Sequence, residues 1–147
     1  MDTPNPVRAF VSHSLRDADV AGPITESLRD KGIATWSDLD IPAGVDRKDQ
    51  IEDALKSSSL YILVFSPDSL DSPWFNFELG AALNRSHKSS EVRLVPILTK
   101  GTTWNDVPAS LRHLKGIDAT RLSREDLLER LGTVLEAISR PAVTRQH

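Results

Sequence analysis

The sequence predicts an α/β fold in which a central parallel sheet of about five strands lies between helices on both faces. Short runs of β-branched and aromatic residues alternate with segments whose apolar residues recur at helical spacing. One run, Leu60–Ser66, is apolar along nearly its whole length, which is typical of a central parallel strand covered on both faces. Alternation of this kind produces a three-layer sandwich, as in the flavodoxin-like folds.

The composition fits a soluble domain and excludes several classes of function. The 147 residues suffice for one domain with a full hydrophobic core, and the chain has no cysteine that could form a disulfide or a thiolate metal site. The net charge is −3 and basic residues are scattered singly, so we expect no nucleic-acid partner. Neither a signal-peptide pattern nor an apolar run of roughly 18 residues occurs, so we expect no membrane partner and a cytoplasmic location.

The first half of the chain predicts two strands and one helix. Val7–Ser12 is a short β-branched and aromatic run, and Ile33–Ser37 is a second one. Between them, apolar residues at helical spacing predict a helix over residues 17–31, which stops at Gly32. Pro23 lies inside this pattern, so we expect the helix to begin late or to be distorted near its start.

The second half continues the alternation after a loop rich in Asp, Pro and Gly. The expected elements are a helix over residues 47–57, the strand Leu60–Ser66, a helix from Ser72 and Pro73 to about Arg85, a strand over Val92–Leu98, a weak strand near Gly116–Ala119 and a final helix. Apolar residues mark the inner face of that last helix: Leu127, Leu128, Leu131, Val134, Leu135 and Ile138. We expect one domain over residues 7–139, a flexible N-terminus at 1–6 and a flexible tail or linker at 140–147, because prolines flank the patterned region.

Polar residues follow the ends of several predicted strands. Ser12, His13 and Ser14 follow the first strand, Asp38 follows the second, and Ser66 ends the third. Ligands of such sheets bind beyond the carboxyl ends of the strands, so these residues predict a site at one rim. None of the histidines shows metal-ligand spacing, and we expect no metal.

Glu78 lies in the most apolar helical segment of the chain, "SPWFNFELGAAL". On a helical wheel it falls beside Trp74, at the margin of the core face and away from the solvent-facing stripe. One interpretation is a carboxylate that pairs with Arg85 or reaches solvent, which would contribute at most about 1 kcal/mol. The other is a partly buried carboxylate beside an aromatic ring, which suits a flat, cationic ligand attached to a sugar.

Three motifs, in order, resemble those of TIR (Toll/interleukin-1 receptor) domains of the bacterial kind. "RAFVSHS" resembles the first family box, "DIPAG" resembles the loop after the second strand, and "SPDSLDSPWFNFEL" resembles the segment in which a glutamate follows a tryptophan by four residues. The resemblance runs from Val7 to Ile138. Many TIR domains cleave NAD+ between nicotinamide and ribose, and some cyclise the product.

The resemblance implies roles for particular residues. Glu78 would be the catalytic residue, and NAD+ would be a substrate, with no cofactor. The implied substrate-binding residues are Ser12, His13, Ser14, Asp38, Gly44, Ser66 and Trp74. The implied oligomer interface, which would reach a neighbouring subunit and complete its site, consists of Asp40, Ile41, Pro42, Ala43 and Gly44.

The chemistry is consistent with a single carboxylate. Ordinary glycoside hydrolysis uses two, one of which protonates a poor leaving group. Nicotinamide leaves from a pyridinium and needs no proton, so one carboxylate suffices to stabilise the oxocarbenium charge. With this chemistry, the resemblance implies an NAD+ nucleosidase, a hydrolase or a cyclase, that is activated by self-association in bacterial immune signalling against phage. Expected partners are other TIR domains and a fused or separate sensor or effector domain.

Three alternatives remain open. The chain could be a non-catalytic TIR–TIR interaction module that assembles a signalling complex. It could be a ribosyl or deoxyribosyl transferase that uses Glu78 as a nucleophile, which predicts exchange between nucleosides. It could also be a receiver domain of a two-component system, although Ser12, His13 and Ser14 stand where receivers carry paired acids.

Overall fold

The structure is a computed structural model that describes residues 7–37, 44 and 46–139. One sheet of five strands has the order β2-β1-β3-β4-β5, and every neighbouring pair is parallel. The strands are β1 (Arg8–Ser12), β2 (Ala34–Ser37), β3 (Leu60–Phe65), β4 (Arg93–Leu98) and β5 (Ile117–Asp118). This order is the flavodoxin-like one, so the predicted fold class is confirmed.

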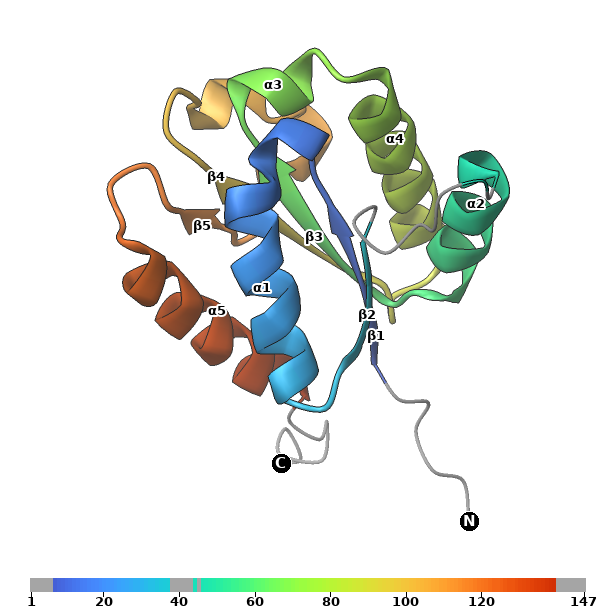
Figure 1. Cartoon of the computed structure of the whole chain (residues 1–147), viewed down its shortest axis with the longest axis horizontal. Helices are drawn as coiled ribbons and strands as arrows, with labels where there is room; N and C mark the ends of the chain where they lie inside the picture. The colour runs from blue at the N-terminus through green and yellow to red at the C-terminus, as the bar shows by residue number, and fades with distance from the viewer. Residues whose placement is uncertain (1–6, 38–43, 45, 140–147) are drawn as a thin grey trace.

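Helices cover both faces of the sheet (Figure 1). The helices are α1 (Ala18–Asp30), α2 (Arg47–Ser57), the short α3 (Pro67–Leu70), α4 (Pro73–Lys88) and α5 (Arg124–Ser139). Helices α1 and α5 pack on one face, and α2 and α4 pack on the other, so that each face has its own hydrophobic core. The molecule is thus a three-layer sandwich.

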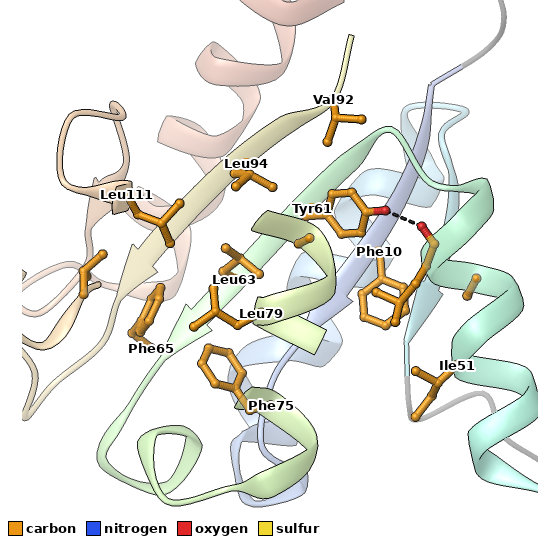
Figure 2. Packing of buried hydrophobic residues seen from close by; sticks show 14 of the residues in the cluster. Phe10, Ile51, Tyr61, Leu63, Phe65, Phe75, Leu79, Val92, Leu94 and Leu111 are labelled. Atoms are coloured by element: carbon orange, nitrogen blue, oxygen red, sulfur yellow. Dashed lines mark hydrogen bonds between the residues drawn. The ribbon is translucent and has the colours of Figure 1, made fainter. Parts of the chain in front are cut away.

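Strand β3, the most apolar run of the chain, lies at the centre of the sheet. All six of its residues are buried, and they alternate between the two cores. Tyr61, Leu63 and Phe65 pack under α2 and α4, among the side chains that Figure 2 shows. The intervening residues, beginning with Leu60, pack under α1 and α5. A strand that is covered on both faces needs apolar residues at every position.

The structure differs from the sequence prediction at two helix ends and in one additional helix. Helix α1 begins at Ala18 and contains Pro23, so the late start expected from Pro23 is wrong, while the alternative of a distorted start stays a prediction. A short 3₁₀ helix over Leu15–Asp17 leads into α1. Helix α4 continues to Lys88, beyond the expected end. Helix α3 was not expected. Residues 1–6 and 140–147 lie outside the described residues, and the predictions for both ends stay untested.

Tyr61, the chain's one tyrosine, joins α2 to α4 through its hydroxyl. The hydroxyl donates to the carbonyl oxygen of Leu55, the bond drawn as a dashed line from Tyr61 in Figure 2. Arg85 Nη1 donates to the hydroxyl at 2.7 Å and to the same carbonyl at 2.8 Å. Burial raises the pKa of Tyr61 above its usual value, and the Arg85 hydrogen bond and charge oppose that rise.

We expect the native chain to form phenolate only above the ordinary tyrosine pKa of about 10. The folded state holds the phenol proton more tightly than the unfolded state, so this contribution to stability is complete below that pH and is lost as the pH rises through the folded pKa. An ultraviolet titration of phenolate measures the pKa of Tyr61 directly, because the chain has no other tyrosine. The same titration in urea is the control, and equal midpoints in both would contradict the buried hydroxyl.

Candidate active site

Glu78 is buried at the rim formed by the carboxyl ends of the strands. Its side chain is 1% exposed, and Ser12 Oγ at the end of β1 donates a hydrogen bond to Glu78 Oε1 at 2.6 Å. The interpretation that Glu78 reaches solvent is therefore wrong. Arg85, the other partner considered, instead donates to the carbonyl oxygens of Leu55 and Ser58 and to the Tyr61 hydroxyl.

The arrangement of α4 confirms the helical wheel. The predicted core residues Phe75, Leu79 and Ala82 are buried, and the predicted solvent stripe, represented by Asn76 and Gly80, is exposed. Ser72 Oγ accepts a hydrogen bond from Phe75 N at 3.2 Å and so caps the start of the helix.

His13 is fixed between the ends of β1 and β2 and is only 3% exposed. Its Nδ1 lies 2.7 Å from the carbonyl oxygen of Ser14, and its Nε2 lies 3.0 Å from Ser37 Oγ. Because a carbonyl oxygen can only accept, Nδ1 carries a hydrogen and donates to Ser14, while Nε2 and the Ser37 hydroxyl share the second hydrogen bond. Ser37 was not among the predicted site residues. The pairing of Val11 with Ser37 in neighbouring parallel strands places it there.

Trp74 stands one helical turn before Glu78 and belongs to a small aromatic cluster. The guanidinium carbon of Arg47 lies 4.8 Å from the centroid of the Trp74 ring, within cation–π range. The ring of Phe77 meets that of Trp74 edge to face, with centroids 6.0 Å apart. Arg47 opens α2 directly after Asp46, whose side chain caps that helix. The structure thus places a cation beside Trp74 that the predicted site did not include.

Ser66 is not engaged with Glu78. Its Oγ donates to Asp17 Oδ2 at 2.5 Å and accepts from Ser69 N at 2.9 Å, as the cap of α3. Ser66 and Asp17 line a cavity of about 540 Å³ beside the first turns of α1 and α5, and Glu78 does not line it. Burial raises the pKa of Asp17, which the Ser66 hydrogen bond opposes and the charge of Asp68 reinforces. Ser12 therefore contacts Glu78, whereas Ser66 lies in a separate cavity beside Asp17.

The loop after β2 is described at one predicted position only. Gly44 is exposed and has a φ of +84°, a conformation that glycine adopts without strain. The other predicted loop residues, Asp38 and the interface residues Asp40, Ile41, Pro42 and Ala43, lie outside the described residues. Their roles stay predictions.

Within residues 7–37, 44 and 46–139, no group of three His, Asp or Glu side chains is placed to hold a metal ion. In the same part of the chain, no helix is both long and apolar enough to cross a bilayer.

The family model described as "TIR domain" matches residues 9–132. The chain belongs to the TIR domain family. A curated relative of this TIR domain, the stimulator of interferon genes protein of Magallana gigas, is 34% identical over 144 residues, which cover 96% of the chain and 33% of the relative. The 2′ cyclic ADP-D-ribose synthase AbTIR of Acinetobacter baumannii is 30% identical over 100 residues, which cover 67% of the chain and 36% of that relative.

A solved structure is similar over nearly the whole TIR domain. The metazoan TIR-STING receptor from C. gigas matches 97% of this chain and 43% of its own chain, with 31% identity and a TM-score of 0.71. The chain spans about a third of the length of the two curated relatives, 33% and 36%. The similarity therefore concerns the TIR portion of larger proteins.

Proposed function

We propose that this TIR domain is an NAD+ nucleosidase that breaks the bond between nicotinamide and ribose. The observation that carries the proposal is the buried carboxylate of Glu78 at the strand rim, hydrogen-bonded by Ser12 and one turn from Trp74. The name of the Acinetobacter relative, a 2′ cyclic ADP-D-ribose synthase, supports the same chemistry.

In the proposed reaction the bond from ribose C1′ to the pyridinium nitrogen breaks. Its electron pair goes to the ring nitrogen, so nicotinamide leaves as a neutral molecule and needs no proton. The Glu78 carboxylate stabilises the positive charge that develops on the ribose. Water then attacks C1′ and releases one proton, which gives ADP-ribose. Attack on C1′ by a hydroxyl group of the same substrate, with loss of its proton, gives a cyclic isomer.

The neighbouring residues would position the reacting groups. Ser12 fixes one oxygen of the Glu78 carboxylate from the end of β1. The face of Trp74 is suited to stack on a flat ring, with Arg47 holding the indole in place. His13 has both ring nitrogens engaged, so we assign it to the support of the rim. Ser14, Gly44 and Asp38 remain proposed substrate contacts, whereas Ser66 is committed to Asp17 and α3.

The burial of Glu78 favours an enzyme that is weakly active as a monomer. A carboxylate that is 1% exposed cannot touch a ribose until neighbouring groups move. We propose that self-association through the loop after β2 supplies that movement, in a cytoplasmic signalling role in bacterial defence against phage. Since the curated relatives are about three times as long, we also propose a fused or separate sensor or effector domain.

The test is NAD+ consumption by the purified chain, first dilute and then concentrated on beads through an affinity tag. We expect clustering to raise the release of nicotinamide, and chromatography of the second product to separate hydrolysis from cyclisation. A folded chain that self-associates on the beads without releasing nicotinamide would refute the proposal.

That negative result would favour the second candidate, a TIR–TIR interaction module without catalysis. The same burial of Glu78 is the observation in its favour, because a carboxylate held by Ser12 inside the fold also fits a structural role. Exchange of bases between nucleosides without net loss of NAD+ would instead indicate a ribosyl transferase.

A further inference from the structure

A second cavity lies at the amino ends of the strands, opposite the rim that carries Glu78. Its volume is about 670 Å³, within the usual range of roughly 300–1,000 Å³ for small-molecule sites. The last turns of α4 and α5, the start of β4 and the segment before β5 form its walls. The cavity is separate from the proposed active site, since neither Glu78 nor Trp74 lines it.

The cavity exists because β5 is too short to cover the edge of β4. Strand β4 pairs with β3 from Arg93 onward, but it pairs with β5 only at Ile97 and Leu98. Arg93 N donates to the Ser59 carbonyl on the β3 side at 2.9 Å. Alternate residues of a parallel strand turn their backbone groups to opposite sides, so the N–H and C=O of Leu94 point toward the open edge. The edge of the sheet therefore contributes polar groups to an otherwise apolar wall.

The titratable side chains that line the cavity are all basic. They are Arg93, Arg130, Lys115, His87 and His113, and no described Asp or Glu lines it, although acidic residues outnumber Lys and Arg by 21 to 18 in the chain. None of these five side chains forms an ion pair within the described residues. Arg130 also lowers the pKa of Asp118, but less than the Thr120 hydrogen bonds do, and Asp118 does not line the cavity.

The floor of the cavity is apolar. It is formed by side chains from β4, β5, α5 and the segment between β4 and β5: Leu94, Leu111, Leu114, Ile117, Val134 and Ile138. Arg93, Lys115 and Arg130 are exposed, so water solvates them when the cavity is empty. An anionic group near them would gain Coulomb attraction, a neutral ligand would gain none, and a cation would be repelled.

We propose that this cavity binds a small organic anion, with an apolar body and a carboxylate, sulfonate or phosphate group. The body would lie on the leucine and isoleucine floor, and the charged group would lie between Arg93, Lys115 and Arg130. The proposal does not depend on NAD+ cleavage, because the residues of the two sites do not overlap.

Two fluorescent probes with related ring systems test the proposal on the full chain. Anilinonaphthalene sulfonate is an apolar anion, and N-phenylnaphthylamine lacks the sulfonate. We expect the sulfonate to bind saturably at one site and more tightly than the neutral probe. The double variant Arg93→Glu with Lys115→Glu should weaken sulfonate binding by at least about tenfold and change binding of the neutral probe little.

The matched control is the double variant Lys31→Glu with Lys56→Glu, which makes the same change in net charge at exposed residues outside the cavity. We expect it to bind the sulfonate like the wild type. Equal weakening in both double variants would mean attraction by net charge alone and would overturn the proposal, as would the absence of saturable binding to the folded chain. Binding that declines as the protein concentration rises would show a second copy in the cavity and would also overturn it. Thermal melting verifies that all variants are folded.

Discussion

Glu78→Gln is expected to lower NAD+ cleavage by the clustered chain by roughly 10²–10³-fold or more while leaving the fold intact. Glutamine has the shape of glutamate, and its Oε1 can still accept the hydrogen bond from Ser12 Oγ. What it removes is the negative charge that would stabilise the ribose cation. Nicotinamide release measures the rate, and thermal unfolding measures the stability of each variant.

Two further variants make this result specific. Ser12→Ala removes the hydrogen bond to Glu78 Oε1 but keeps the charge, so we expect a smaller loss of rate than for Glu78→Gln. Glu91→Gln changes an exposed carboxylate outside the site and should cleave NAD+ at the wild-type rate. Cleavage by Glu78→Gln within about threefold of wild type would show that the charge at this position is not needed, since a factor of three corresponds to less than about 1 kcal/mol of the barrier.

Gly116→Ala should destabilise the fold by about 1–3 kcal/mol or more. A Cβ atom at this position would lie 2.4 Å from the carbonyl oxygen of Pro96 and 2.8 Å from Cη2 of Trp104. The first of these atoms belongs to the backbone of β4 and cannot move away without disturbing the short pairing with β5. The free energy of unfolding in urea measures the effect.

Gly80→Ala is the matched control, because it makes the same substitution in open space. Gly80 is exposed inside α4, and a Cβ atom there would have no neighbour within 4 Å. Alanine should therefore stabilise the helix by about 0.5–1 kcal/mol. Equal free energies of unfolding for Gly116→Ala and wild type would contradict the close approach of the chain to β4.

The sheet and the long helices could be predicted because their signals are local. The continuous apolar run of β3 predicts a strand buried on both faces of the sheet. The spacing of apolar residues in α4 and α5 predicts helices that are buried along one face. Helix α3 is a single turn, too short for a period, and its signal was the reciprocal capping of Ser66 and Ser69. The start of α1 was misjudged because α1 begins at Ala18 and includes Pro23 in its second turn, at the loss of one backbone hydrogen bond.

The site could be predicted only in part, because sequence does not report contacts between distant segments. The helical wheel placed Glu78 at the margin of the core. It could not predict that Ser12, 66 residues earlier at the end of β1, contacts Glu78. The sequence does predict that Ser12 and Ser66 lie on opposite faces of the sheet. Side chains alternate across a strand. Ser12 therefore shares the α2–α4 face with Phe10, and Ser66 shares the opposite face with Val64.

Side-chain contacts join helices α2 and α4 at both of their ends. Near their starts, Arg47 stacks on Trp74, and near their ends Arg85 donates to the carbonyl oxygens of Leu55 and Ser58, beside the buried hydroxyl of Tyr61. Separating the helices would exchange the Arg85 hydrogen bonds for bonds to water, at a net cost of about 1.5–3 kcal/mol for each bond from the charged guanidinium. We therefore expect α2 and α4 to move together, so that the movement proposed to open Glu78 to a ligand would occur outside this pair of helices.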